Sequence, residues 1–519
     1  MKFRWNYNET EDLPIFEQII ENRQIDDTFL FSDFNDIPSY SLLKDIEKAT
    51  TRILDALTKN QKIMIYGHDD VDGVSATYIL FDFLGKIGFQ NHFYYIPNRL
   101  LENHGFSVSL MQKLLQDNYD LLVTVDGGIS EFSNIENLNE LGIDVIITDH
   151  HLVPDITPDA FAIVNPKQPD CKFPDKMLAG VTVSYFLVKA IAAKLDFEID
   201  ENYLFWVAVG TIADKVPMLG VNRLIVKEVI DRWFLFDDPA LLALKPYIVT
   251  NPGYEQRIGS LKYIARLLSN GRQPFGEHQA LNFLLAPKSE KEIIIKNLVR
   301  EQRDYDARIN QVSELLEDVE IDNGNCIVYF DENDRIEVNL MGFAASQLSS
   351  KYKIPSVILK KRDGVISGEA RATKGFCLIK AFGYCKEVLI QFGGHSRAAG
   401  FTTKQENLNV FIALFNAYCD KKKDTIKFYQ KLSIDAVFSI DQIDMFYDYL
   451  QTEYHLLQPF GQGNRNPTFL LKNYCPEKDW HKFKLKDSKN KLEFNKTYDI
   501  LFKFKSMNFY LVDYKEVEN

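Results

Sequence analysis

Four short polar clusters in this chain carry the residue types that bind divalent metal ions. They are His68, Asp70 and Asp72 in GHDDVDG, Asp126 in VTVDGG, Asp149-His150-His151 in ITDHH, and Asp214 in GTIADKVP. Carboxylate and imidazole ligands suit Mn²⁺, Mg²⁺, Zn²⁺ or Fe²⁺, and the lack of a neighbouring cysteine disfavours a thiolate site. Because gathered carboxylates repel one another, bound cations would offset the cost of burying them. The clusters therefore predict a metal centre that hydrolyses phosphate esters.

Short apolar runs that are typical of buried strands lie beside these clusters. The runs are KIMIY, FYYIP, DLLVTV and DVIIT, and helical patterns separate them. This alternation predicts a mainly parallel sheet covered by helices, in which ligands bind beyond the carboxyl ends of the strands. A single aspartate at a strand end is more often a turn former or a helix cap. Four clusters in succession favour a metal site over four unrelated turns.

The rest of the chain predicts further domains. The segment from Lys288 to about Glu320 is charged and apolar at helical spacing, which predicts one long connecting helix. A second α/β unit with the glycine-rich segment FGGHSRAAGF follows it, and the β-rich C-terminal residues predict a small β-barrel. The expected parts are an extension (1–45), the metal-binding domain (46–285), the connecting helix (286–322), the second α/β domain (323–424) and the barrel (425–519).

Composition narrows the class of protein without defining it. The net charge of −13, from 60 basic and 73 acidic residues, argues against a nonspecific nucleic-acid coat protein but allows a local basic groove. The stretches 351–374 and 472–505 are locally basic, and each is either a solvated face or a phosphate-binding surface. The six scattered cysteines form no CxxC pair, which suits a reducing cytoplasm, and no apolar run is long enough for a membrane span.

The ordered motifs also carry a family resemblance, which covers roughly residues 45 to 519. GHDDVDG, VDGG, TDHH and GTIADKVP resemble the DHH phosphoesterase superfamily in order and approximate spacing. FGGHSRAAGF is similar to the Gly-Gly-His motif of the domain that accompanies DHH domains in nucleic-acid and cyclic-dinucleotide phosphodiesterases. YIPNRLLENHGFS, AIVNPKQPDCKFP and LQPFGQGNRNPTF resemble the RecJ family of bacterial single-strand exonucleases. The resemblance implies a DHH domain, a DHH-associated domain and an OB-like barrel that binds nucleic acid.

The resemblance also implies roles for the metal-binding residues. One Mn²⁺ ion, or Mg²⁺ in its place, would be held by His68, Asp70 and Asp126. A second ion would be held by Asp72, Asp126, His150 and Asp214, so that Asp126 bridges the two. Asp149 would orient the imidazole of His150. His151 would face the substrate, where it would stabilise charge or protonate the leaving oxygen.

For the substrate, the resemblance implies a pocket for the terminal 5′ phosphate. Arg99 and Arg371 would grip this phosphate, because a guanidinium group suits bidentate contacts. Gly393, Gly394 and His395 would form a phosphate-binding turn. The chain departs from the RecJ pattern at His68, where those proteins usually have aspartate. It departs again at Glu369, where they tend to have serine and where a carboxylate would oppose a phosphate.

The function implied by the resemblance is a 5′-to-3′ exonuclease that releases mononucleotides from single-stranded DNA in repair and recombination. Single-strand-binding protein or a helicase are its candidate partners. One alternative is a phosphodiesterase for short oligonucleotides or cyclic dinucleotides, but such relatives lack the β-rich tail. Another is a noncatalytic DNA-binding scaffold, which would be expected to have lost ligands that this chain retains. The first 45 residues are either a packing extension or a docking segment, and the oligomeric state stays open.

Overall fold

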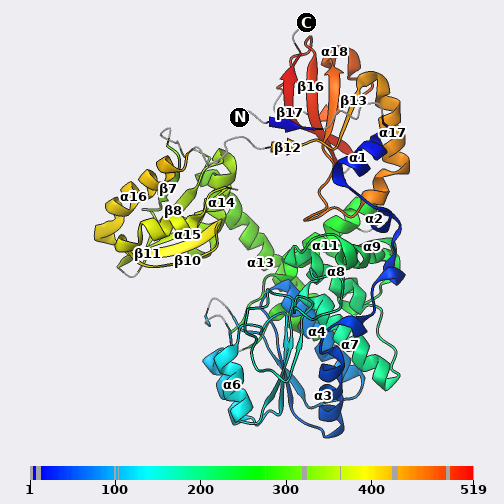
Figure 1. Cartoon of the computed structure of the whole chain (residues 1–519), viewed down its shortest axis with the longest axis vertical. Helices are drawn as coiled ribbons and strands as arrows, with labels where there is room; N and C mark the ends of the chain where they lie inside the picture. The colour runs from blue at the N-terminus through cyan, green and yellow to red at the C-terminus, as the bar shows by residue number, and fades with distance from the viewer. Residues whose placement is uncertain are drawn as a thin grey trace. The chain divides into compact units, whose positions relative to one another are not determined.

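The structure is a computed structural model of the whole chain (Figure 1). It describes every residue except 1–3, 8–12, 99–100, 103–104, 250, 275, 318, 320–323, 363, 374, 424–430, 487–490, 506 and 518–519. The residues group into two units, one of 7–302 with 433–519 and the other of 1–6 with 303–432. The larger unit therefore combines most of the N-terminal extension, the metal-binding domain and the C-terminal β-rich segment.

A five-stranded parallel sheet forms the centre of the metal-binding domain. Its strands are β2 (Ile63–Tyr66), β3 (His92–Tyr95), β4 (Leu121–Val125), β5 (Asp144–Thr148) and β6 (Ala162–Val164). The four strands expected from the apolar runs are confirmed, and the order in the sheet is β3-β2-β4-β5-β6. Since β3 and β4 lie on opposite sides of β2, the winding direction reverses between β2 and β4. Ligands of open α/β sheets bind at such a switch point.

Helices cover both faces of this sheet. The helices of this domain, some of which pack on other helices, are α3 (Ile46–Thr58), α4 (Val71–Lys86), α5 (Val108–Gln116), α6 (Phe132–Glu140), α7 (Gly180–Leu195), α8 (Tyr203–Asp214), α9 (Gly220–Asp231), α10 (Pro239–Leu244), α11 (Tyr254–Leu268) and α12 (Gln279–Leu285). Helix α4 is buried along most of its length, because it contacts the sheet and also packs against α7 and α8 (Figure 1). Polar residues of the candidate site lie in the first turn of α4 and the last turn of α8, and the first turn of α7 binds one of them.

The predicted long helix is confirmed as α13 (Lys288–Leu315), and the boundary between the two units falls within it. In the smaller unit a mixed sheet has the order β10-β11-β9-β8-β7. The elements are β7 (Ile327–Phe330), α14 (Met341–Tyr352), β8 (Ser356–Arg362), β9 (Val365–Arg371), α15 (Leu378–Tyr384), β10 (Leu389–Gly394), β11 (Ala398–Lys404) and α16 (Leu408–Lys421). None of the described helices is long and apolar enough to cross a membrane.

The C-terminal segment is a five-stranded mixed sheet with helices on it. Its elements are β13 (Ala436–Ser439), α17 (Ile443–Thr452), β14 (Phe469–Tyr474), α18 (Pro476–Asp479), β15 (Leu485–Lys486), β16 (Tyr498–Lys505) and β17 (Asn508–Glu516). The order is β13-β14-β16-β17-β15, and within the described residues no ladder joins β13 to β15. The expected barrel is therefore open there. Helix α17 was missed, although Ile443, Phe446 and Tyr449 have helical spacing and are buried against the sheet.

The N-terminal extension completes this C-terminal sheet. Helices α1 (Ile15–Arg23) and α2 (Asp27–Phe31) lie beside it, and Ile15 and Ile19 belong to its apolar core. The amide of Gln18 pairs with both backbone groups of Val437 on edge strand β13, donating to the carbonyl at 3.1 Å and accepting from the N–H at 2.8 Å. This side chain thus takes the place of a neighbouring strand and covers an edge that would otherwise be open to pairing.

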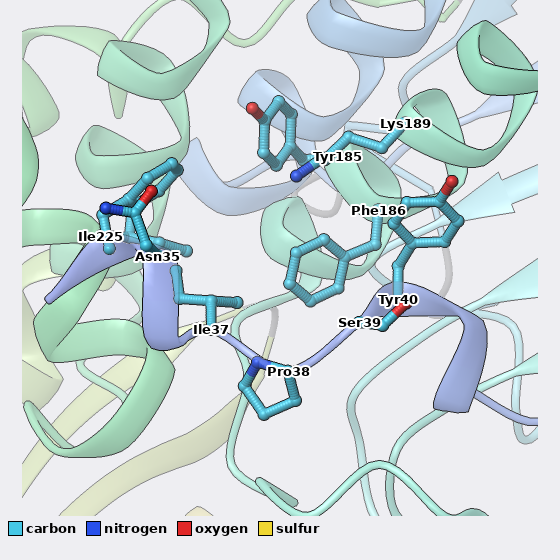
Figure 2. A pocket seen from close by; sticks show the side chains of 10 residues that line it. Asn35, Ile37, Pro38, Ser39, Tyr40, Tyr185, Phe186, Lys189 and Ile225 are labelled. Carbon is cyan, nitrogen blue, oxygen red and sulfur yellow. The ribbon is translucent and has the colours of Figure 1, made fainter. Parts of the chain in front are cut away.

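The segment between α2 and α3 packs on helix α7 and leaves a cavity of about 300 Å³ there. Ile37, Pro38 and Tyr40 line the cavity from the segment, and Phe186 and Lys189 line it from α7 (Figure 2). Residues 13–45 of the extension therefore pack on both the α/β part and the β-rich part of the larger unit.

Candidate metal centre

The turn from β2 into α4 positions the first cluster. Asp70 caps α4 by accepting a hydrogen bond from the Gly73 N–H at 3.0 Å. Asp72 lies in the first turn and is buried, because its carboxylate accepts the N–H groups of Gly180 and Val181 at the start of α7, at 2.7 and 2.8 Å. The positive end of α7 thus holds this carboxylate in place. His68 lies opposite, with Nδ1 3.0 Å from an Asp70 oxygen.

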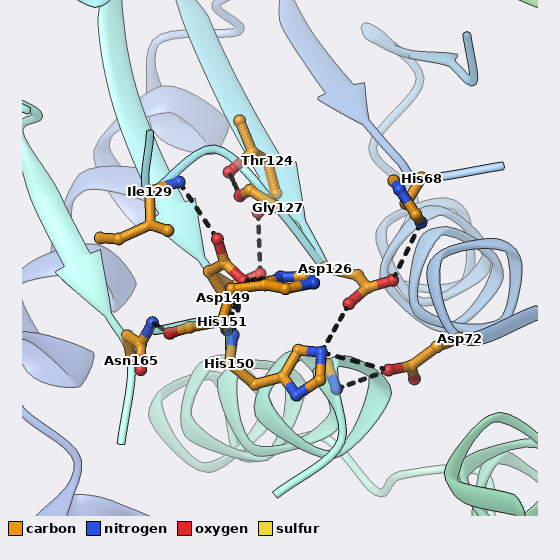
Figure 3. A network of polar contacts seen from close by, with 12 residues as sticks. His68, Asp72, Thr124, Asp126, Gly127, Ile129, Asp149, His150, His151 and Asn165 are labelled. Atoms are coloured by element: carbon orange, nitrogen blue, oxygen red, sulfur yellow. Dashed lines mark hydrogen bonds and ion pairs between the residues drawn. The ribbon is translucent and has the colours of Figure 1, made fainter. Parts of the chain in front are cut away.

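Asp126 is at the centre of the site (Figure 3). It follows β4 with a φ of +58°, a left-handed conformation that is uncommon for a residue with a side chain. Its two oxygens face different histidines, one 3.6 Å from His68 Nδ1 and the other 3.1 Å from His150 Nε2. A Cβ on Gly180 would lie 2.4 Å from the Asp126 carboxylate, so glycine is required for this close approach. The buried Asp126 carboxylate therefore links the two sides of the site.

Asp149 contacts His151 and not the imidazole of His150, which corrects the expected pairing. Its Oδ1 atom accepts from the backbone N–H groups of His150 and His151, and lies 2.7 Å from His151 Nδ1. The carboxylate folds back over the N–H groups that follow it, as aspartate does in Asx turns, and this brings it to the ring two residues ahead. Asp149 therefore orients His151, while the buried His150 ring faces Asp126.

The last turn of α8 brings Asp214 to the same place. One Asp214 oxygen and one Asp72 oxygen each lie 3.8 Å from His150 Nε2. Three groups of potential ligand atoms result, each with its atoms within 4.8 Å of one another. The groups are His68, Asp70 and Asp126; Asp72, His150 and Asp214; and Asp126, His150 and His151. The six residues expected to bind metal are thus brought together.

The buried carboxylates of the cluster lie close to one another, and bound cations would offset their charge. Burial, followed by the negative charges of Asp72 and Asp70, raises the pKa of Asp126 well above its usual value. Burial, followed by the charges of Asp214 and Asp70, does the same to the pKa of Asp72. Three buried atoms form no hydrogen bond in the described part of the chain, although two of them lie 3.1 Å apart. They are Nδ1 of His68, and the facing pair of Oδ1 of Asp126 and Nε2 of His150. Oxygen and imidazole atoms that lack donors fit divalent ions such as Mn²⁺ and Mg²⁺.

His151 differs from the other residues of the cluster because its side chain is 54% exposed. The hydrogen bond from Asp149, opposed by burial, raises the pKa of His151 above its usual value. In turn, Asp149 has a lowered pKa although burial opposes this, because His151 donates to it and carries positive charge. The pair therefore places a half-exposed imidazole with a raised pKa, held by Asp149, at the edge of the site.

Two further contacts that the motifs did not predict stabilise this arrangement. Lys167, in the segment AIVNPKQPD, donates from Nζ to the His150 carbonyl. Arg272 forms an ion pair at 2.7 Å with Asp69, a wholly buried residue between His68 and Asp70. Asp69, the first acid of GHDDVDG, was a signal that such a partner exists. Its identity could not be read from the sequence, because the two residues are 203 positions apart.

The expected substrate residues are only partly described. Arg99 lies outside the described residues. Arg371 lies at the end of β9 in the smaller unit, where it pairs with Glu369 at 3.1 Å, so that this carboxylate faces the guanidinium. Gly393 and Gly394 end β10, pairing with Gly400 and Ala399 of β11. The exposed His395 follows in the hairpin, where its backbone N–H donates to the Ala398 carbonyl at 2.7 Å.

Comparisons with known proteins agree with this fold and site. Residues 62–211 match the DHH family, N-terminal domain, and residues 323–421 match the DHHA1 domain. These matches contain five of the six expected metal ligands and the Gly-Gly-His segment. The sixth ligand, Asp214, lies just beyond the end of the range that matches the DHH family. The chain belongs to the DHH superfamily.

Within the superfamily, the chain is similar to RecJ proteins. The single-stranded-DNA-specific exonuclease RecJ of Bacillus subtilis (strain 168) is 32% identical over 443 residues, which is 83% of this chain and 54% of that protein. RecJ of Haemophilus influenzae is 26% identical over 451 residues, 79% of this chain and 75% of that protein. The crystal structure of RecJ from Thermus thermophilus in complex with Mn²⁺ shares the fold. It has a TM-score of 0.75 and 21% identity, and covers 100% of this chain and 80% of that one. The chain thus spans about half the length of its Bacillus subtilis relative.

Proposed function

We propose that this chain is a metal-dependent exonuclease that degrades single-stranded DNA from its 5′ end and releases mononucleotides. The observation that carries the proposal is the pair of ligand groups on either side of Asp126, with buried carboxylates and imidazole nitrogens that lack hydrogen bonds. The relatives named as single-stranded-DNA-specific exonucleases support the choice of substrate. The solved RecJ complex with Mn²⁺ supports that ion, and a related structure holds Mg²⁺.

In this proposal, His68, Asp70 and Asp126 hold one ion, and Asp72, Asp126, His150 and Asp214 hold the other. Two such ions would neutralise charge on a phosphodiester and lower the pKa of a water molecule enough for it to attack at neutral pH. The N–H groups at the start of α7 keep Asp72 in place, and Gly180 leaves room for Asp126. His151 donates a proton from the exposed edge of the site to the leaving oxygen, while Asp149 fixes its ring.

The smaller unit would recognise the end of the strand. Arg371 offers the bidentate donors that suit a terminal phosphate, and Glu369 would orient its guanidinium. His395 and the glycines before it form an exposed hairpin where a phosphate could approach the backbone. The six cysteines are unpaired, which suits a reducing cytoplasm, where we propose that the enzyme acts. Single-strand-binding protein or a helicase is the candidate partner in repair.

The test is a substrate panel with Mn²⁺. Single-stranded DNA with a labelled 5′ end, the matching duplex, a dinucleotide and cyclic di-AMP are incubated with the protein and with an Asp126→Asn variant. We expect mononucleotides from the 5′ end of the long single strand, little product from the duplex, and none with the variant. Cleavage of the dinucleotide or cyclic dinucleotide alone would overturn the choice of substrate. Equal activity of the variant would overturn the site.

A further inference from the structure

Glu369, where the sequence departs from the RecJ pattern, forms an ion pair within strand β9 of the smaller unit. Its Oε2 atom accepts a hydrogen bond from Nη1 of Arg371 at 3.1 Å, and the same Nη1 donates to the Ala370 carbonyl at 2.9 Å. The two charged residues are two positions apart on the strand, so their side chains leave the same face of the sheet. The guanidinium that is expected to bind the strand end therefore carries a carboxylate beside it.

Two glycines leave room for this ion pair. Gly400 of β11 is the ladder partner of Glu369, and a Cβ on it would lie 2.9 Å from Glu369 Oε1. A Cβ on Gly342, in the first turn of α14, would lie 2.5 Å from Arg371 Nη2. A side chain at either position would push a charged group aside. Both glycines therefore favour the observed placement of the carboxylate and the guanidinium.

Glu369 also lines a cavity of about 450 Å³ in the smaller unit. Gly393 of the Gly-Gly-His segment and Gly400 line the same cavity, so its wall is backbone on that side. Arg362 is the other charged residue among the described residues that line it. Because Glu369 pairs with Ile358 of β8, Arg362 lies four residues, or about 13 Å, further along that strand. A group that enters beside the Gly-Gly-His segment therefore meets the Glu369 carboxylate first.

A carboxylate in this place reduces the advantage of a terminal phosphate. Phosphate oxygens are negative and only accept hydrogen bonds, so Glu369 repels a phosphate that approaches Arg371 while the guanidinium attracts it. A 5′-hydroxyl carries no charge and can donate a hydrogen bond to the carboxylate. With serine at this position, the charge of Arg371 would act on the phosphate without this opposition. The residue at position 369 therefore sets how strongly the two kinds of strand end are distinguished.

We propose that Glu369 lets the chain degrade strands that end in a 5′-hydroxyl as well as strands that end in a 5′-phosphate. The proposal rests on the proposed exonuclease function, in which the smaller unit recognises the strand end, and it adds which ends are accepted. Glu369 is thus a specificity-determining residue, which balances the charge of Arg371 and accepts a hydrogen bond from the terminal hydroxyl.

The test uses two oligonucleotides of one sequence that differ only in the 5′ group. Their kcat/KM values with Mn²⁺ are measured for the full-length parent, Glu369→Ser and Glu369→Gln, and expressed as the ratio of phosphate to hydroxyl. The fraction of active protein cancels in each ratio. We expect a ratio below about five in the parent, since the phosphate gains little from a balanced pair. The ratio should rise about tenfold or more in both variants, because the contact between guanidinium and phosphate is then unopposed.

Glu387→Gln is the matched control, because it removes the same charge from an exposed acid of the same unit and should keep the parent ratio. A parent ratio above about five, or no rise in the two Glu369 variants, would overturn the proposal. An equal rise in Glu387→Gln would also overturn it, since any loss of negative charge would then suffice. A parent that hydrolyses neither strand refutes the exonuclease. Competition between the two strands for binding in EDTA then decides the end preference by the same ratios.

Discussion

The buried acids of the metal centre and the His151–Asp149 pair at its edge differ in whether their charges have partners within the chain. Asp72 and Asp126 are buried beside other acids, and imidazole nitrogens of the cluster lack hydrogen-bond partners within the described residues. His151 is instead half exposed, and its Nδ1 lies 2.7 Å from the Asp149 carboxylate. The buried acids depend on bound ions for compensating charge, whereas the pair has its partner within the chain. The comparison predicts a larger loss of activity when a buried ligand is removed than when the partner of His151 is removed.

The largest effect is expected for Asp126→Asn. This residue contributes to both sides of the metal centre, and losing it removes several kcal/mol of charge stabilisation. Hydrolysis of single-stranded DNA should fall about 1000-fold or more. The affinity for the strand, and its dependence on salt concentration, should stay at the parent value. Single-turnover rates and binding titrations at several salt concentrations measure the two quantities. A variant with parent-like turnover would show that the centre does not depend on this link.

A smaller loss is expected for Asp149→Asn. The amide lacks the charge that raises the pKa of His151, so kcat should fall about 100-fold, the typical contribution of a positioned acid. Because Asp149 raises the pKa of His151, the alkaline limb of the pH–rate profile should move to lower pH in the variant. A profile that only scales down, without moving, would argue that Asp149 merely supports the turn.

Metal binding should stabilise the fold, because the ligands of the centre come together only in the folded chain. Mn²⁺ at about 100 times its dissociation constant should add about 2.7 kcal/mol of stability for each bound ion. The thermal unfolding midpoint should rise accordingly, and the rise should be lost in Asp126→Asn but kept in His395→Ala, whose side chain is exposed in the smaller unit. Differential scanning calorimetry with and without EDTA measures it. An equal rise in all three proteins would place the ions elsewhere.

The smallest effect concerns His278, which lies behind the metal-binding turn. Burial, followed by the charge of Arg272, lowers its pKa to about 4, and its Nδ1 accepts from the Ala280 N–H at the start of α12. The unfolded chain therefore takes up the proton first as the pH falls. The contribution of neutral His278 is fully present above pH 6.5 and is lost between 6.5 and about 4. Between pH 7 and pH 6 the parent should lose roughly 0.7 kcal/mol more stability than His278→Gln. Parallel pH profiles of the unfolding midpoint would contradict this.

The features that could be predicted from the sequence are those with a local pattern. Strands β2 to β5 are short apolar runs, α13 is one charged helix, and the acid and histidine clusters directly follow strands or end a helix. Contacts between distant residues left no such pattern. The pairing of Gln18 with Val437 spans 419 residues, and that of Asp69 with Arg272 spans 203. The pairing of Asp149 with His151 was assigned to the wrong histidine, because the fold-back of its carboxylate depends on backbone geometry.

The most direct test of the central claim is the number of Mn²⁺ ions that the full-length chain binds. A titration followed by electron paramagnetic resonance measures this number and the magnetic coupling between the ions. We predict two ions per chain, coupled through the carboxylate of Asp126, with loss of the coupling in Asp126→Asn. A stoichiometry below two in the parent, or an unchanged spectrum in the variant, would contradict the account of the metal centre.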